Sequence, residues 1–253
     1  MKLSVLTPVY NEEASVDRAL KLALAVDYPC EVEFVVVNDG SKDGTAAALD
    51  AITDERLRVI HHDRNRGKGA AIRTAVQHAT GDYLVILDAD MEYDAGDIPG
   101  LIRPVLEGRA QVVYGNRQFG SHSSFSFWYV MGNKGVTLAA NIIFNSYISD
   151  LETCFKLMPL ELYRELDVRY TGFGMEAEVT GKLLRRKIRP YEVPISYHAR
   201  SREEGKKITA WDGVEALAIL ARERMRRVKP TVTIPKQRSG PASAADRPAV
   251  PKG

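Results

Sequence analysis

Short apolar runs alternate with stretches of helical spacing along the first third of the chain. The runs are rich in Val, Ile and Leu, as is typical of strands covered on both faces, and they span residues 2–9, 33–38, 57–61 and 82–87. Helical spacing separates them over residues 12–25, 43–53 and 68–79. This alternation predicts an α/β fold with a mostly parallel central sheet, flanking helices and right-handed crossovers.

The rest of the chain is less regular. We expect strands at residues 110–114, 153–158 and 190–195, and helices at 125–144, 176–187 and 209–228. From Lys229 onward the sequence turns to Pro, Ser, Ala, Gly and basic residues without apolar periodicity, so burial cannot offset its ordering entropy. These patterns predict a single domain over residues 1–228 and a disordered tail over 229–253.

Composition narrows the class of protein. A chain of 253 residues with 45% apolar residues can bury a full core within one domain. The net charge of +2 gives no overall field, so partners must be read from local clusters, and we expect no nucleic-acid partner. Cys30 and Cys154 stand outside any C-x-x-C pattern, which argues against a disulfide framework and against a thiolate zinc site.

No stretch of the sequence has the pattern of a membrane helix or a secretion signal. The most apolar stretch, 125–144, is interrupted by Asn133, Lys134 and Asn141, whereas a membrane helix needs about 20 apolar residues. Residues 1–10 have the pattern of a strand and not of a cleavable leader. We therefore expect a cytoplasmic protein that is soluble or lies peripherally at the inner face of the membrane.

Polar residues follow three of the predicted strands, at 10–12, 39–41 and 88–90. Ligands of open α/β sheets bind beyond the carboxyl ends of the strands, so we expect the three clusters to converge on one cleft. Asp88 and Asp90 follow the most apolar strand, where two carboxylates and the phosphate oxygens of a donor could share Mg²⁺ or Mn²⁺. Glu92 is a further candidate ligand, and the alternative for this cluster is a solvated turn.

Two other segments are candidates for contact with a nucleotide. Asp39 could accept hydrogen bonds from a base or ribose, whereas Asp43 fits better as a helix cap. Residues 64–69 place basic side chains and glycines before a helix, a position that suits phosphate or ribose hydroxyls, and Lys68 lies among them. The segment lacks the spacing of a phosphate-binding loop of ATPases, and a solvated turn is the alternative for its arginines.

Four motifs together resemble those of the family 2 glycosyltransferases. They are T-P-V-Y-N-E at 7–12, V-N-D-G-S-x-D-G-T at 37–45, N-x-G-K-G-A-A at 65–71 and L-D-A-D at 87–90. The second half is similar to the polyprenyl-phosphate glycosyltransferases of the dolichol-phosphate mannose synthase group. The motifs that carry this are Y-G-N-R at 114–117, D-L-E-T-C-F-K-L-M at 150–158, G-F-G-M-E-A-E at 172–178, and E-V-P-I-S-Y-x-A-R followed by E-G-K-K-I within 192–208.

The resemblance implies a GT-A fold, inversion at the anomeric carbon, a GDP- or UDP-sugar donor, and a polyprenyl phosphate acceptor. It assigns the nucleotide contacts to Pro8, Tyr10, Glu12 and Asp39. It assigns the metal ligands to Asp88, Asp90 and the position of Glu92, where the family often has Gln. It assigns the contacts with phosphates to Arg117, Arg200 and Lys207. Arg117 and Arg200 then clamp the acceptor, since guanidinium groups match phosphate oxygens at two points.

Two other functions remain open. A hydroxyl acceptor would need a carboxylate to remove its proton, and Glu176 is the candidate base, with Asp150 and Glu152 as secondary candidates. Glu176 could instead be a helix-start carboxylate that stabilises the macrodipole. The third possibility is a protein that binds a nucleotide sugar without catalysis, although the acceptor-side motifs argue against it.

Two stretches are candidates for contact with a membrane surface or a membrane protein. Aromatic residues gather at Phe125 and over 127–130, and Trp211 begins a helix that ends in Arg222, Arg224, Arg226 and Arg227. An apolar helix face with a basic end suits weak, salt-sensitive association with anionic lipid. The alternative is that the aromatic run packs in the core.

Overall fold

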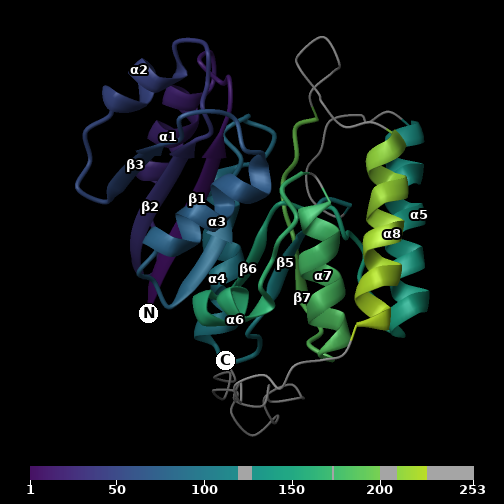
Figure 1. The fold of residues 1–253 in the computed structure, drawn as a ribbon. Helices are drawn as coiled ribbons and strands as arrows, with labels where there is room; N and C mark the ends of the chain where they lie inside the picture. Colours follow the sequence, from purple (N-terminus) through teal and green to yellow (C-terminus); the bar gives the residue numbers. More distant parts are fainter. Residues whose placement is uncertain (119–126, 173, 200–209, 227–253) are drawn as a thin grey trace, which may run out of the picture.

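The computed structural model describes residues 1–118, 127–172, 174–199 and 210–226 (Figure 1). Several predictions fall outside these residues. They concern Phe125, Arg200, Lys207, Arg227 and the tail 229–253.

Within the described residues, seven strands form one sheet in the order β3-β2-β1-β4-β6-β5-β7. They are β1 (Lys2–Val9), β2 (Glu31–Asn38), β3 (Leu57–His61), β4 (Tyr83–Ile86), β5 (Val113–Asn116), β6 (Lys156–Pro159) and β7 (Tyr191–Pro194). β1 pairs in parallel with β2 and β4, β2 with β3, and β5 with β7. The predicted mostly parallel sheet is therefore confirmed.

One strand runs against the others. β6 is antiparallel to both β4 and β5. The chain reaches it through residues 150–155, which lie at the carboxyl edge of the parallel strands, so the strand has to run back across the sheet. This reversal brings Glu152 and Cys154 to the same edge as the ends of β1 and β4.

Helices cover the sheet, and their bounds lie close to those predicted except for two helices that were not expected. The helices are α1 (Val16–Ala25), α2 (Thr45–Asp50), α3 (Lys68–His78), α4 (Ile98–Leu106), α5 (Phe127–Phe144), α6 (Leu160–Leu166), α7 (Met175–Arg185) and α8 (Ala210–Met225). The unexpected helices are α4, preceded by a 3-10 turn (Ala95–Asp97), and α6. α4 carries Pro99 in its first turn and Pro104 inside, which weakens its helical pattern in the sequence.

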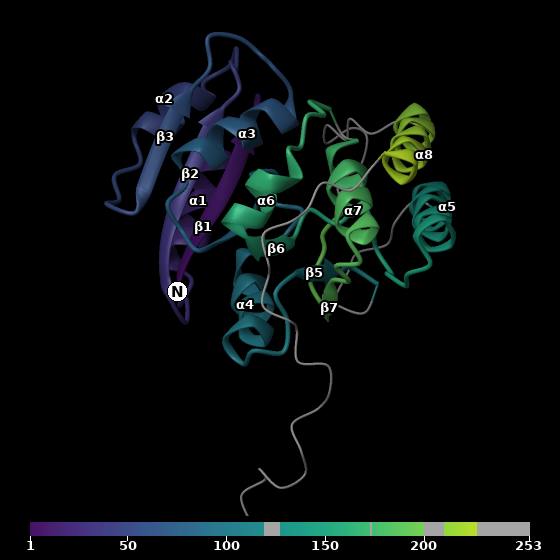
Figure 2. The same ribbon diagram turned by 60° about the horizontal axis from the view of Figure 1, so that its bottom comes forward.

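Helices α5 and α8 stand side by side at one edge of the molecule, beyond α7 (Figures 1 and 2). They run in the same direction, because a Cβ atom at Gly213 would lie 3.9 Å from Val136 and Arg224 Nε donates to the Ile143 carbonyl at 3.2 Å. Their facing sides pack on α7 through a small apolar cluster that includes Ala140 and Leu220. Among the described residues, no helix combines the length and the apolar character needed to cross a membrane.

Candidate active site

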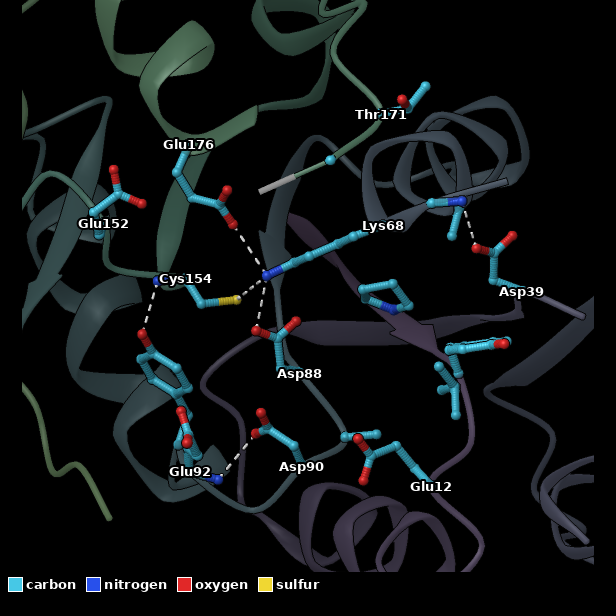
Figure 3. A pocket seen from close by; sticks show the side chains of 18 of the residues that line it. Glu12, Asp39, Lys68, Asp88, Asp90, Glu92, Glu152, Cys154, Thr171 and Glu176 are labelled. Carbon is cyan, nitrogen blue, oxygen red and sulfur yellow. Dashed lines mark hydrogen bonds and ion pairs between the residues drawn. The ribbon is translucent and has the colours of Figure 1, made fainter. Parts of the chain in front are cut away.

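A cavity of about 380 Å³ opens at the carboxyl edge of the sheet (Figure 3). The ends of β1, β2 and β4 each contribute polar residues, as the order of strands and helices predicted. The lining residues that were also predicted to be functional are Pro8, Tyr10, Glu12, Asp39, Lys68, Asp88, Asp90, Glu92, Arg117, Glu152 and Glu176. Further lining residues that the sequence did not single out include Tyr93, Cys154, Thr171 and Tyr197.

Lys68, at the start of α3, joins two carboxylates that come from different parts of the fold. Its Nζ lies 2.8 Å from Asp88 Oδ2 at the end of β4 and 3.0 Å from Glu176 Oε1 at the start of α7. Burial disfavours the ammonium charge, but the nearby Asp88, Cys154 and Glu176 outweigh it and raise the pKa of Lys68 well above its usual value. Lys68 therefore stays protonated, although the sequence suggested only a contact with phosphate.

Close backbone packing fixes the position of Lys68. A Cβ atom at Gly67 would lie 2.4 Å from the Thr171 carbonyl oxygen, and one at Gly69 would lie 2.0 Å from that of Tyr170. Gly67 also has φ +91°, a conformation that L side chains rarely adopt, and the Gly69 amide donates to the Thr171 carbonyl at 2.9 Å. The start of α3 is thus pressed against the segment that leads into α7.

Glu176, which is buried, and Glu152, which is partly exposed, are two carboxylates on the same wall of the cavity (Figure 3). Glu176 Oε1 is paired with Lys68, whereas Oε2 is buried without a hydrogen-bond partner among the described residues. Burial, followed by the charge of Glu176, raises the pKa of Glu152 to about 7. The cavity therefore holds one carboxylate oxygen in need of a donor and one carboxyl group that changes protonation near neutral pH.

Arg117 is held in place by Asp150. Its Nε and Nη2 donate to Asp150 Oδ2 and Oδ1 at 2.6 and 2.7 Å, and its guanidinium lies 4.9 Å from the centre of the Tyr197 ring. Asn133 also donates to Asp150, at 2.8 Å. Burial would raise the pKa of Asp150, but the Arg117 guanidinium lowers it, so this carboxylate is an anchor for Arg117 and is poorly suited to act as a base.

The predicted metal ligands are not gathered into one cluster. Glu92 Oε2 accepts a 2.6 Å hydrogen bond from the Tyr197 hydroxyl, and Asp90 Oδ1 accepts one of 3.0 Å from the Glu92 amide. In the part of the chain that the structure describes, no group of three or more Asp, Glu, His or Cys residues is arranged to hold a metal ion. Asp88 and Asp90 both border the cavity, and their carboxylates are of the type that hard divalent ions prefer.

Asp39 stabilises the loop that follows β3. One of its oxygens lies 2.7 Å from His62 Nδ1, and the Arg66 and Gly67 amides donate to the carboxylate at 2.9 and 2.7 Å. Asp39 borders the cavity but has these partners already. Asp43 accepts from the Thr45 amide at 3.1 Å just before α2, whereas the N-cap position of this helix is Gly44.

The charges that line the cavity are strongly unequal. Among its described lining residues are the carboxylates of Glu12, Asp39, Asp88, Asp90, Glu92, Glu152 and Glu176. The cationic side chains among the same residues are Lys68 and Arg117, and both already have carboxylate partners. An anionic ligand would be repelled here unless it brings a cation with it.

Comparisons with known proteins show which family and which folds this chain is similar to. The family model described as "Glycosyl transferase family 2" matches residues 4–167. A dolichol-phosphate mannosyltransferase of Pyrococcus furiosus is 26% identical over 211 residues, which cover 81% of this chain and 59% of the relative. A low-salt glycan biosynthesis hexosyltransferase of Haloferax volcanii is 27% identical over 205 residues, which cover 79% of this chain and 49% of the relative.

A shorter match has higher identity. An undecaprenyl-phosphate 4-deoxy-4-formamido-L-arabinose transferase of Shewanella sediminis is 36% identical over 111 residues, 42% of this chain and 34% of the relative. The chain thus spans about half to three fifths of the length of the first two relatives. Among solved structures, glucosyl-3-phosphoglycerate synthase from Mycobacterium tuberculosis in complex with UDP has a TM-score of 0.67 and 19% identity, covering 88% of this chain and 80% of that one.

Proposed function

Because the chain belongs to glycosyltransferase family 2, we propose that it transfers a hexose from a GDP- or UDP-sugar to a polyprenyl phosphate, with inversion and with the help of Mg²⁺ or Mn²⁺. Its fold is the GT-A fold expected from the sequence. The observation that carries the proposal is the cavity at the ends of β1, β2 and β4, where Asp88 and Asp90 face an otherwise acidic space. A donor diphosphate requires a cation to enter such a space.

Asp88 and Asp90 supply the number of carboxylates that suits a divalent ion bound jointly by the protein and the substrate. Mg²⁺ is usually bound through one or two carboxylates together with substrate phosphates and water, so two carboxylates without a preformed third ligand suit it. Bound there, the ion would neutralise the charge that develops on the departing nucleoside diphosphate. Glu92, which is hydrogen-bonded to Tyr197, would support the turn between Asp90 and the cavity wall.

A lipid phosphate acceptor agrees with the surroundings of Arg117. Asp150 takes Nε and Nη2, which leaves Nη1 of a rigidly oriented guanidinium for an acceptor oxygen. A phosphate monoester is already anionic near neutral pH, so its oxygen can attack the anomeric carbon without a general base while the bond to the diphosphate breaks. Arg200 and Lys207 are proposed to complete the acceptor site, and two relatives are a dolichol-phosphate mannosyltransferase and an undecaprenyl-phosphate sugar transferase.

A membrane surface is the proposed location of that acceptor. Helix α5 exposes an apolar row of Trp128, Met131, Leu138 and Ile142, and Trp128 is 79% exposed. On α8, Trp211 is 78% exposed, the last turn carries the exposed Arg222 and Arg224, and the exposed Arg226 follows the helix. Because α5 and α8 run in the same direction, both tryptophans stand toward one end of the helix pair and the arginines toward the other, so the proposed contact with anionic lipid is along the exposed side of the pair.

The test is an assay of GDP- and UDP-hexoses with a polyprenyl phosphate, with Mn²⁺ or with EDTA, in which the lipid product is extracted and identified. We expect transfer from one donor class with Mn²⁺ and little transfer with EDTA. Asp90→Asn serves as the inactive reference and Asp17→Asn, on the exposed face of α1, as the matched active one. Absence of any lipid-linked sugar from every donor would rule the proposal out.

A second candidate function is transfer to a saccharide hydroxyl. The observation that favours it is Glu176, whose Oε2 is buried without a hydrogen-bond partner among the described residues and could accept a hydroxyl proton. Glu176→Gln separates the two functions when donor binding is measured alongside turnover. Near-complete loss of turnover with intact donor binding supports the hydroxyl acceptor, and near-normal turnover supports the phosphate acceptor.

A further inference from the structure

The ammonium group of Lys68 lies against one of the two carboxylates proposed for the metal. Its Nζ is 2.8 Å from Asp88 Oδ2, and both side chains are about four fifths buried, with 18% and 19% of their surface exposed. Asp88 therefore already has a cationic partner before any substrate arrives. A divalent ion bound to Asp88 would stand directly beside this ammonium and would be repelled by it.

Lys68 also has a second carboxylate to which it can turn. Glu176 Oε1 lies 3.0 Å from Nζ, on the other side of the ammonium group from Asp88, and Glu176 Oε2 has no hydrogen-bond partner among the described residues (Figure 3). A small rotation of the side chain would loosen the contact with Asp88 and keep the contact with Glu176. The backbone need not move, since Gly67 and Gly69 hold it against Thr171 and Tyr170.

Binding of a nucleoside diphosphate would favour rotation of the Lys68 side chain away from Asp88. The diphosphate brings negative charge between Asp88 and Lys68, both of which line the cavity, and an ammonium group is a good partner for phosphate oxygens. Once Lys68 contacts the phosphate, Asp88 is released for the metal ion. The metal in turn reduces the repulsion between the diphosphate and the acidic cavity wall, so each ligand favours the binding of the other.

We propose that Lys68 is a built-in counter-ion that keeps free divalent ions from Asp88 and releases this carboxylate when a nucleoside diphosphate binds. The inference rests on the proposed function, because it concerns the metal and donor sites of that reaction. It predicts how binding of the metal ion depends on binding of the nucleotide. The metal binds weakly alone and tightly with the nucleotide, which prevents the acidic cavity from filling with a metal ion that has no donor to act on.

The experiment measures binding of Mn²⁺ by the electron paramagnetic resonance signal of the free ion, with and without saturating UDP or GDP, for wild type, Lys68→Met, Lys68→Arg and the surface control Lys21→Met. For wild type, we expect the nucleotide to tighten Mn²⁺ binding by about tenfold or more, within the usual range of coupling between sites. Lys68→Met should bind Mn²⁺ alone about tenfold more tightly than wild type and show weaker coupling to the nucleotide. Lys68→Arg keeps the positive charge, so it should bind Mn²⁺ alone less tightly than Lys68→Met does, and Lys21→Met, at an exposed position of α1, should behave as wild type does.

The outcomes separate this inference from the proposed function. Coupled binding of Mn²⁺ and nucleotide in wild type, with the same affinities in Lys68→Met, would overturn the counter-ion role and leave the metal-dependent reaction intact. Absence of Mn²⁺ binding under every condition would overturn both. If Lys68→Met does not fold, the same Mn²⁺ titrations are made with Glu176→Gln. Removal of the second partner should hold Lys68 on Asp88, weaken binding of Mn²⁺ alone and increase the coupling, and unchanged values would contradict the proposal.

Discussion

Arg117 and Asp150 meet at the inner wall of the cavity through two hydrogen bonds of 2.6 and 2.7 Å, with the Asp150 side chain almost fully buried. The pair fixes the guanidinium plane of Arg117, which lines the cavity. Arg117 thus depends on a residue 33 positions further along the chain for its orientation. Several of the predictions below follow from such pairs, in which one partner orients the other.

Asp150→Asn should destabilise the protein, because it leaves the Arg117 guanidinium buried without its counter-charge. Breaking a buried pair from one side typically costs about 3 to 5 kcal/mol. Urea unfolding followed by circular dichroism measures this loss. Asp27→Asn, at an exposed position, should change the free energy of unfolding by less than about 0.5 kcal/mol. Equal stabilities of the two variants would contradict the anchoring role of Asp150.

Arg117→Lys should impair use of the acceptor more than stability. A lysine ammonium cannot contact both oxygens of Asp150 and a phosphate in the geometry of a guanidinium. We expect a fall in kcat/KM for the lipid phosphate of about tenfold to a hundredfold, the loss of one or two charge-assisted hydrogen bonds, with donor affinity preserved. Steady-state kinetics with the acceptor varied, together with donor titration, measure both effects. A selective rise in the KM of the donor would contradict the assignment.

Asp88→Asn and Asp90→Asn should each abolish metal-assisted donor binding. Each removes a hard anionic ligand from a site with two carboxylates, and the loss of a group that stabilises developing charge costs about 10² to 10³ in kcat. Calorimetric titration of the nucleotide with and without Mn²⁺ checks the binding. Retention of the full enhancement by Mn²⁺ in both variants would show that the ion binds elsewhere.

Glu152 should make the protein less stable as the pH rises from about 4.5 toward 7. Burial and the charge of Glu176 raise the pKa of Glu152 to about 7 in the folded protein, whereas the unfolded chain keeps the ordinary value of 4.5. Between these values the unfolded state has released the proton and the folded state has not, so stability decreases with pH and levels off above pH 7.

Glu152→Gln removes this titration. Relative to wild type, the variant should gain up to about 3 kcal/mol of unfolding free energy between pH 5 and pH 8, since each pKa unit corresponds to about 1.4 kcal/mol. Urea unfolding at the two pH values measures the gain, with Glu215→Gln on the exposed face of α8 as the control. Parallel pH profiles for wild type and Glu152→Gln would mean that Glu152 titrates normally.

Trp128→Gln and Trp211→Gln should weaken binding to anionic liposomes. The two side chains are 79% and 78% exposed on neighbouring parallel helices, so each change removes apolar surface from the same proposed contact. Cosedimentation with vesicles that contain phosphatidylserine should detect the loss, and binding by wild type should fall between 50 and 200 mM salt. Leu22→Gln, half exposed on α1, is the matched control. Equal binding by all variants would place the contact elsewhere.

Much of the sheet could be predicted because the strands are continuous apolar runs, and β1 even has the predicted bounds, Lys2–Val9. The strand ends then fixed which polar residues would meet, and Tyr10, Asp39 and Asp88 do line one cavity. The short helix α4 was not predicted, because Pro99 and Pro104 interrupt its pattern. The direction of β6 depends on where the preceding loop enters the sheet, which local spacing does not encode.

The pairings within the cavity were harder to predict than its membership. Lys68 and Glu176 are far apart in the sequence, and their contact depends on how closely α3 packs on the segment before α7. The engagement of Glu92 by Tyr197 likewise depends on a bridge between Tyr93 and Tyr197 that no short motif indicates. Motifs identified the residues, whereas tertiary packing decided their partners.

The close contact of Gly67 and Gly69 with Thr171 and Tyr170 also determines how the molecule can move. Backbone packed against backbone leaves no room for a hinge between the start of α3 and residues 170–171. The backbone that carries Lys68 should therefore keep its position against residues 170–171 in every state of the reaction cycle. The wall of the cavity that carries Lys68 would then keep its shape, and a hexose too large to fit against this wall would not bind.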